Sequence, residues 1–290
     1  MKKSLALILA ALVASTVALT ACTKEAPVAD EPSVEPEAEV EAEVEEEPEA
    51  EEPAEESDLA YIKEKGTLVI GITDFEPMDY QDENGNWIGF DADVAVAFAE
   101  SLGVKAKFQI IDWDNKVFEL NSKSIDVVWN GMTLTDEVKA AMECSNAYCN
   151  NAQVVIVRAD EADKYADVES LKELAFAVES GSAGQDMAEE NEFSFTEVAD
   201  QATALLEVKS GSADAAIIDS LMAAAMVGEG TSYADLTYTL PLNSEEYGAG
   251  FRKGSDAAAA LNDFLKASYE DGSLMEVAET YGVQAALIAQ

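Results

Sequence analysis

From residue 67 onward, short apolar stretches alternate with amphipathic ones, and this alternation is the feature that most restricts the fold. Residues 67–72 are short, β-branched and apolar, which predicts a buried strand. Residues 91–102 place their apolar side chains on one helical face, with Asp91 as a predicted N-terminal cap and Gly103 at the end. Strands separated by helices predict parallel sheets and an α/β fold.

The same alternation runs through the chain twice. Further strands are expected at 106–111, 125–129 and 153–157, and then at 174–178, 214–218 and 248–251. Helices are expected at 118–123, 135–142, 199–208, 221–227, 257–269 and 274–281, with another following the turn at 180–184. Two series with a final return predict two α/β lobes, and a cleft between lobes is where small ligands bind.

The N-terminus has the pattern of an export signal. A basic head at Lys2 and Lys3 precedes an apolar run over 5–19, which is too short for a transmembrane helix. The run ends in Leu-Thr-Ala-Cys, which resembles the lipobox of bacterial lipoproteins. That resemblance implies removal of residues 1–21 and acylation of Cys22, palmitate included, since stable anchoring needs more than one chain. The alternative is an ordinary cleavable signal with a chance cysteine.

Residues 22–58 are predicted to form an acidic tether. The stretch consists mainly of Glu, Ala, Pro and Val, contains five of the seven prolines and has no aromatic residue. Such a composition cannot bury enough apolar surface to offset the entropy of ordering, so we expect disorder. The tether would hold a folded domain away from the membrane.

Charge and residue types exclude several functions. The chain has a formal charge of −42 and no histidine, so it would repel nucleic acid and anionic lipid. Two cysteines in the folded part, Cys144 and Cys149, supply too few soft ligands for a metal site, and no metal or cofactor is expected. Either these cysteines form a disulfide or both remain free thiols.

Eight short motifs resemble one family in order and spacing. They are GTLVIG (66–71), FEPMDY (75–80), GFDAD (89–93), IDVVWNGMTLT (125–135), VESGS (178–182), ADAAIID (213–219), YGAGFRKG (247–254) and DGSL (271–274). This pattern resembles the extracellular solute-binding proteins of family 3, the polar amino-acid-binding proteins of ABC importers with a periplasmic-binding-protein-like type II fold. The resemblance implies a first lobe over 59–151 and 244–290 and a second over 152–243. Two hinge strands are expected near 147–152 and 242–247.

The resemblance also implies a ligand site. Two aromatic side chains would enclose the ligand side chain, although core packing is the alternative role for each. One strand would offer backbone and hydroxyl groups, a helix start would receive a carboxylate, and one acid would bind an ammonium group. A plain helix cap is compatible with the role of the serine. Phe75 and Trp113 match the aromatic positions, and Gly131 and Thr133 match the strand positions, with Asn130 just before them also expected in the cleft. Ser182 and Ala183 match the helix start, and Asp219 matches the acid.

The chain departs from the family at two places that bear on the ligand. Val138 stands where the family usually has an arginine for the α-carboxylate, and Lys139 points about 100° away around the helix. Arg158 and Arg252, the only arginines, lie at positions that are not ligand contacts in the family. Glu179 stands where lysine is frequent, so we also expect it in the pocket. Acids, aromatics and a missing arginine favour a cationic ligand or a weakly anchored zwitterion. The alternative is an ordinary amino acid whose carboxylate rests on backbone N–H groups and Thr133.

The predicted function is capture of an amino acid or cationic amine-like solute by a lipoprotein on the outer face of the cytoplasmic membrane. The expected partner is an ABC permease with its ATPase. One alternative is a ligand-sensing lipoprotein that signals to a membrane receptor. Another is a dehydratase-like enzyme on the same fold, but without histidine and without a nucleophile motif we expect no enzyme.

Overall fold

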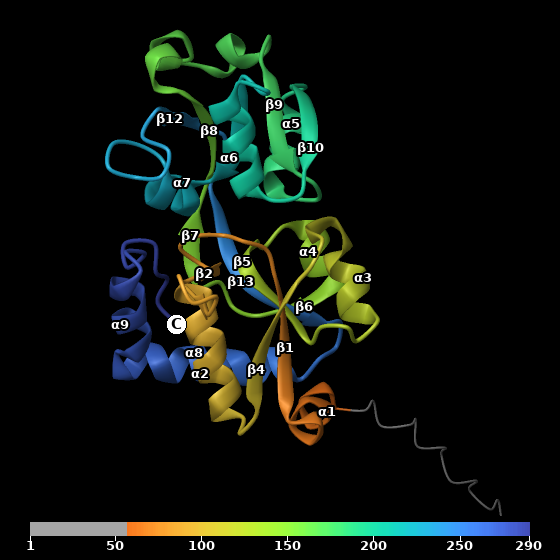
Figure 1. Cartoon of the computed structure of the whole chain (residues 1–290). Coiled ribbons are helices and arrows are strands. Elements are labelled where there is room, and N and C mark those ends of the chain that lie inside the picture. The colour runs from red at the N-terminus through yellow and green to blue at the C-terminus, as the bar shows by residue number, and fades with distance from the viewer. Residues whose placement is uncertain (1–56) are drawn as a thin grey trace, which may run out of the picture. The chain divides into compact units, whose positions relative to one another are not determined.

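The computed structural model describes residues 57–290, so the predicted signal peptide, Cys22 and nearly all of the predicted tether lie outside the described residues. The described chain forms two lobes, each built on one sheet (Figure 1). None of the helices in this range is long and apolar enough to cross a membrane.

The first lobe contains a six-stranded sheet with strand order β4-β1-β5-β13-β6, and β7 also pairs with β13. Its strands are β1 (Thr67–Ile72), β4 (Lys105–Ile110), β5 (Val127–Thr133), β6 (Met142–Cys144), β7 (Cys149–Asn151) and β13 (Glu245–Arg252). A small hairpin is formed by β2 (Tyr80–Gln81) and β3 (Trp87–Ile88). The helices are α1 (Asp58–Lys65), α2 (Phe90–Ser101), α3 (Lys116–Asn121), α4 (Asp136–Ala141), α8 (Ala257–Asp271) and α9 (Ser273–Thr280), with a 3-10 turn η1 (Trp113–Asn115).

The second lobe contains a five-stranded sheet with strand order β10-β9-β11-β8-β12. Its strands are β8 (Gln153–Arg158), β9 (Ala175–Glu179), β10 (Ser194–Val198), β11 (Ala215–Asp219) and β12 (Leu236–Pro241). The helices are α5 (Ala183–Glu190), α6 (Gln201–Ser210) and α7 (Ser220–Met226), with 3-10 turns η2 (Ala159–Lys164) and η3 (Val168–Leu171). Its core includes Phe176 stacked on Phe193, with ring centroids 4.6 Å apart.

The sheets are mixed, so the expectation of parallel sheets holds for only part of each sheet. Strands β1, β4 and β5 are parallel, as are β9, β10 and β11, but β13 runs antiparallel to β5, and β8 antiparallel to β11. The reversed strands are the ones beside the connections between lobes. A chain that leaves one sheet directly into the other enters it without a crossover helix, so it need not run parallel to its neighbour.

The chain passes between the sheets at two places. It leaves the first sheet after β7 and enters the second at β8, and it returns from β12 to β13. Figure 1 shows both passages between the upper and lower parts of the molecule. They overlap the hinge strands expected near 147–152 and 242–247. The lobe boundaries at 151/152 and 243/244 remain a proposal at the level of single residues.

Asp91 does not cap helix α2, which corrects the expectation. Gly89 is the N-cap, and α2 starts at Phe90. The Asp91 carboxylate is fully buried and accepts hydrogen bonds from the Gly131 N–H at 2.6 Å and from the Tyr148 hydroxyl at 2.8 Å. A tertiary contact therefore outweighs the local capping preference of aspartate.

The two cysteines of the described chain are free. Cys144 lies opposite Gly250 on β13, whereas Cys149 lies opposite Tyr247 three residues earlier on the same strand. Three residues of a strand span about 10 Å, which is beyond the reach of a disulfide without movement of the backbone. The structure therefore contains two free thiols and no disulfide between Cys144 and Cys149.

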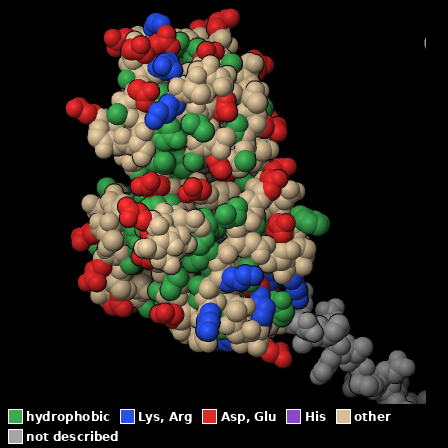
Figure 2. All heavy atoms as spheres, viewed as in Figure 1, with side chains coloured by type: hydrophobic (Ala, Val, Ile, Leu, Met, Phe, Trp, Pro, Cys, Tyr) green, Lys and Arg blue, Asp and Glu red, His purple; other side chains and the backbone are tan. Residues whose placement is uncertain are grey.

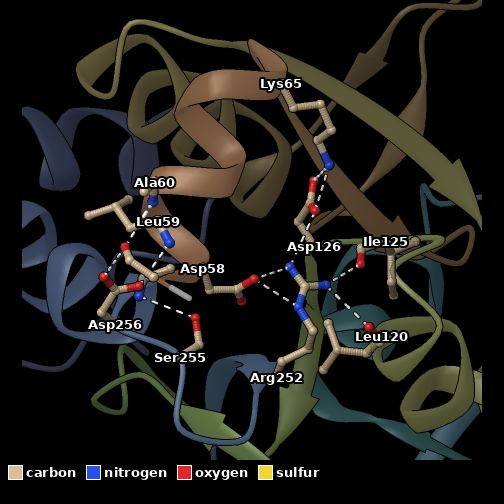
Figure 3. A network of polar contacts seen from close by, with 12 residues as sticks. Asp58, Leu59, Ala60, Lys65, Leu120, Ile125, Asp126, Arg252, Ser255 and Asp256 are labelled. Carbon is tan, nitrogen blue, oxygen red and sulfur yellow. Dashed lines mark hydrogen bonds and ion pairs between the residues drawn. The ribbon is translucent and has the colours of Figure 1, made fainter. Parts of the chain in front are cut away.

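Arg252 joins the first helix of the described chain to the sheet (Figure 3). Its guanidinium donates to Asp58 at 2.6 and 2.9 Å and to the backbone carbonyl of Ile125 at 2.8 Å. It also lies 3.4 Å from Asp126, a fully buried carboxylate whose other partners are Lys65 and the Val69 N–H. This ion network joins α1 to β13 and to the residues just before β5, three segments that lie far apart in the sequence.

Candidate functional site

A cavity of about 270 Å³ lies between the lobes, and all nine predicted ligand-binding residues line it. The first lobe contributes β5, η1, α3 and α4, and the second contributes the ends of β9 and β11 and the start of α5. Figure 2 shows Asp and Glu side chains on both sides of the waist between the lobes. Five carboxylates line the cavity, those of Asp114, Glu137, Glu179, Asp186 and Asp219.

The two aromatic residues pack in the protein core and also line the cavity. Phe75 is 3% exposed and packs edge-on against Tyr247, with ring centroids 6.3 Å apart. Trp113 packs in a small core with Val69, Ile111 and other apolar side chains. Each also lines the cavity. Core packing therefore holds their rings in place, and a ring edge or face remains for a ligand.

Strand β5 forms one wall, but most of its polar groups are already bonded within the protein. The Asn130 amide donates to the Thr73 carbonyl and to Asp79, and its oxygen accepts from Thr73 N–H and hydroxyl groups at 2.9 and 2.8 Å. The Gly131 N–H donates to Asp91. The Thr133 hydroxyl donates to Glu245 at 2.9 Å, which leaves its oxygen as an acceptor. This wall therefore contributes mainly the shape of the cavity, and few of its N–H groups are free to bind a ligand.

Gly131 is required for that shape. Its φ is +53°, and an added Cβ would lie 2.6 Å from the Phe75 ring and 3.2 Å from the Tyr247 ring. The left-handed backbone and the close aromatic contact both exclude a side chain. The glycine therefore lets the Phe75 ring lie directly on β5.

A pair of buried acids lies behind this wall. Asp79 and Asp91 are both fully buried, and each has one carboxylate oxygen without a hydrogen-bond partner. Burial raises the pKa of Asp91 to about 7, and burial together with the Asp91 charge raises the pKa of Asp79 well above its usual range. The pair therefore holds a proton near neutral pH, directly behind Asn130 and Gly131.

The start of α5 faces the cavity from the second lobe. Ser182 is its N-cap, accepting from the Gln185 N–H at 3.2 Å and donating to the Glu179 carbonyl at 2.7 Å. The plain capping role is therefore present. Ala183 begins the helix, where backbone N–H groups lack intrahelical acceptors and favour negative charge.

Asp219 is held by a cage of neutral donors at the hinge. One carboxylate oxygen accepts from Asn151, from Gln153 at 2.9 Å and from the Tyr247 hydroxyl at 2.7 Å, and the other accepts from Gln201. Burial, followed by the charge of Glu245, raises the pKa of Asp219 to about 8. Three of the donors lie on β7, β8 and β13, the strands at the passages between the lobes. Asp219 therefore contacts the hinge as well as the cavity.

Glu179 is a second acid in the same wall, one strand away. It ends β9 as Asp219 ends β11, and these strands are neighbours. Glu179 is 3% exposed, and its Oε1 has no hydrogen-bond partner. Burial, then the charges of Asp219 and Asp200, raise the pKa of Glu179 to about 8.

Lys116 is a lining residue that the sequence reasoning missed. Among the described lining residues it is the only lysine or arginine. Its ammonium donates to the Gly181 carbonyl at 2.8 Å and the Trp113 carbonyl at 3.2 Å, and it lies 5.1 Å from the centre of the Trp113 ring. Its position directly after the Trp113 turn was a usable signal, because it placed a cation next to a predicted ligand residue. Gly181, Gln185 and Gln201 were missed as well.

Neither Lys139 nor either arginine of the chain takes the place of the arginine that the family usually has at position 138. Val138 lines the cavity, whereas Lys139 is exposed and outside it, and neither Arg158 nor Arg252 is a lining residue. A second cavity of about 620 Å³ adjoins the first and shares Thr133 and Ala183 with it. This second cavity, called the mouth below, is lined by no described lysine or arginine. Its lining includes the six carboxylates of Asp136, Glu137, Asp186, Glu190, Glu245 and Glu246.

Two α/β lobes joined by two passages, with a polar cavity between them, define a ligand-binding protein of the two-lobed periplasmic class. The sequence profile of the bacterial extracellular solute-binding proteins, family 3, matches residues 68–284, and the chain belongs to this family. Members of the family bind amino acids and deliver them to ABC transporters, and the chain has this substrate-binding role.

Individual relatives agree with this assignment. The arginine-binding extracellular protein ArtP of Bacillus subtilis is 32% identical over 72% of this chain and 84% of its own length. The L-cystine-binding protein TcyJ of Escherichia coli is 28% identical over 78% of this chain and 86% of its own. A crystal structure of a mutant of ArgBP from T. maritima superposes with a TM-score of 0.73 at 33% identity, covering 78% of this chain and 99% of that one.

Enzymes also occur among the matches. A cyclohexadienyl dehydratase of Pseudomonas aeruginosa is 26% identical over 58% of this chain, and a membrane-bound lytic murein transglycosylase is 24% identical over 76% of it. The relatives with higher identity are named as binding proteins.

Proposed function

We propose that this chain captures a cationic amino acid or a related cationic amine between its lobes and delivers it to a membrane permease driven by an ATPase. The observation that carries the proposal is the acidic lining of the cavity, which has five carboxyl groups and one lysine among its described lining residues. Buried carboxylates are stabilised by a bound cation, and they repel an anionic ligand.

The aromatic residues and the mouth support the same ligand class. Phe75 and Trp113 present ring surface to the cavity, and aromatic faces attract cations. The acidic mouth would raise the local concentration of a cation before it enters. The relative ArtP is named as an arginine-binding protein, which is consistent with a basic ligand on this fold.

The ligand carboxylate, where the ligand has one, would rest on groups other than arginine. The first N–H groups of α5 and the remaining N–H of Lys116 line the cavity together and can donate to it, whereas the Thr133 hydroxyl already donates to Glu245. Asp219 would receive the α-ammonium group of the ligand, and Phe75 and Trp113 would enclose its side chain. We assign the nine predicted residues and Lys116 to the binding site.

A binding panel tests this function. Thermal shift followed by isothermal titration would compare arginine, lysine, ornithine, histidine, glutamine, cystine, glutamate and aspartate, with putrescine and choline as amines that lack a carboxylate. A ligand that binds only the folded protein raises the melting temperature. We expect the cationic compounds to give the largest shifts. Tight binding of glutamate or aspartate with no cation bound would refute the proposed ligand class.

The anchor and the cellular role need separate experiments. We infer that Cys22 is acylated and holds the domain outside the cytoplasmic membrane; labelled palmitate should be incorporated in the wild type and lost in Cys22→Ala. Loss of radiolabelled uptake on deletion would support import. Unchanged uptake with an altered transcriptional or motility response would instead favour the ligand-sensing alternative. We expect no dehydratase turnover from the purified protein.

A further inference from the structure

Glu179 and Asp219 are not equivalent partners for a ligand cation. Both oxygens of Asp219 accept hydrogen bonds from Asn151, Gln153, Gln201 and Tyr247. Glu179 is equally buried, yet its Oε1 has no partner in the protein. A buried carboxylate oxygen without a donor is unfavourable, so a ligand donor that reaches it gains more there than at a satisfied acid.

The nearby cation does not satisfy Glu179. Lys116 faces it from the first lobe, but the Lys116 ammonium bonds to the Gly181 and Trp113 carbonyl oxygens, and no ion pair within 4.0 Å joins the two side chains. Lys116 therefore leaves the Glu179 oxygen available while partly balancing its charge.

The other groups around Glu179 are acidic or neutral. Asp219 faces it from β11, Asp200 from the residue before α6, and Gln201 from the first turn of α6. Glu245 on β13 lies beyond Asp219 and acts on that acid. Burial and these like charges favour the protonated form of Glu179 in the protein without ligand, up to a pH of about 8.

We propose that Glu179 is the specificity-determining residue of the pocket: it accepts the ammonium or guanidinium group of a basic ligand side chain and gives up its proton to solvent when that group binds. The exchange is balanced, since a neutral carboxylic acid and a cation become a carboxylate–cation pair and one free proton. This inference rests on the proposed function, and it assigns the side-chain group to Glu179 and leaves the α-ammonium group to Asp219.

Matched ligand pairs test the role of charge at constant shape. Arginine is compared with citrulline, whose ureido group is neutral, and lysine with norleucine. The wild type should bind the cationic member of each pair tighter by on the order of tenfold or more. Glu179→Gln, which resembles the protonated acid in shape, should bring each ratio close to unity without loss of the fold. Asp160→Asn, an exposed acid of η2 in the same lobe, makes the same change of charge outside the pocket and should leave the ratios unchanged.

Proton release provides a readout that a merely structural role would not change. Titration of arginine at pH 6.5 in two buffers of different ionisation enthalpy should show proton release that is larger in the wild type than in Glu179→Gln by close to one proton. Release that remains in the variant comes from Asp219, whose pKa burial also raises to about 8. Equal affinity for arginine and citrulline in the wild type, or unchanged ratios and proton release in Glu179→Gln, would overturn the inference while leaving amino-acid binding intact. If no member of either pair binds and no cation of the wider panel binds either, the proposed function fails as well.

Discussion

Lys116 of the first lobe and Gly181 of the second meet across the cleft, where the Lys116 ammonium donates to the Gly181 carbonyl oxygen at 2.8 Å. Gly181 has a φ of +70°, and a Cβ added there would lie 2.7 Å from the Cα of Asp114, the residue two positions before Lys116. The lobes therefore touch at a point where one side has no side chain. Because Gly181 also leads into α5, this contact borders the cavity directly.

Gly181→Ala should prevent this approach of the lobes. The contacted atom is backbone, so the clash cannot be relieved by a rotamer change. We expect ligand affinity to fall by on the order of tenfold or more, as measured by titration calorimetry. Gly211→Ala is the matched control, since Gly211 has a similar φ of +80° with open space around its Cβ position. Both variants should lose about 1 kcal/mol of stability from the left-handed backbone, and equal ligand affinity in the two would contradict the prediction.

Lys116→Met should loosen the same contact without adding bulk. It removes two hydrogen bonds to carbonyl oxygens, one of them between lobes. A hydrogen bond contributes about 1 kcal/mol, which corresponds to roughly a fivefold change in the population of the closed arrangement. Small-angle scattering should give a larger radius of gyration for the ligand-free variant than for the wild type. Lys139→Met on exposed α4 is the control, and a wild-type radius for Lys116→Met would show that this bond does not hold the lobes together.

The central elements of the fold could be predicted because their apolar residues form a local pattern. The strand expected at 153–157 is observed as Gln153–Arg158, and that expected at 214–218 as Ala215–Asp219. The edge strands β10 and β12 were missed. β10, Ser194–Val198, has no fully buried residue, so neither a continuous apolar run nor a buried face marks it in the sequence.

The candidate site was only partly predictable, for a similar reason. All nine residues predicted for the ligand site line the cavity. Lys116 and Gln201 were missed because their functions depend on partners far along the chain, Gly181 in one case and Asp219 in the other. The bonded state of Asp219 could not be predicted either. Its cage requires that two hinge passages and α6 converge, which no local pattern encodes.

The buried acids should make the protein less stable as the pH rises. Folding raises the pKa of Asp91 to about 7 and that of Asp79 well above the usual value. A carboxyl with a raised pKa binds its proton more tightly in the folded state, so its favourable contribution is complete below about pH 4 and is lost as the pH rises through the folded value. Urea denaturation should therefore give a larger free energy of unfolding at pH 5 than at pH 8.

Asp79→Asn should remove part of this pH dependence. An amide at position 79 can still accept from Asn130, and its N–H can face the unpartnered oxygen of Asp91. We expect the variant to be more stable than the wild type at pH 8 by on the order of 1 kcal/mol, with a smaller difference at pH 5. Glu83→Gln, at an exposed acid between β2 and β3, is the control for net charge. A variant with the same pH slope as the wild type would show that the buried pair is not its source.

The two arginines of the chain should differ sharply in their contribution to stability. Arg252 is 9% exposed and pairs with Asp58 and the fully buried Asp126, whereas Arg158 makes only contacts of 3.4 and 3.5 Å with the carbonyl oxygens at the end of α6. Arg252→Met leaves Asp58 without its guanidinium partner and removes one of the two cations beside the fully buried Asp126, which costs about 3–5 kcal/mol, while Arg158→Met should cost well under that. Chemical denaturation of both variants measures the difference. Hydrogen exchange should also show α1 opening first in Arg252→Met, because the guanidinium joins that helix to β13 (Figure 3). Equal losses in the two variants, or unchanged protection of α1, would mean that apolar packing rather than this ion network fixes the first helix.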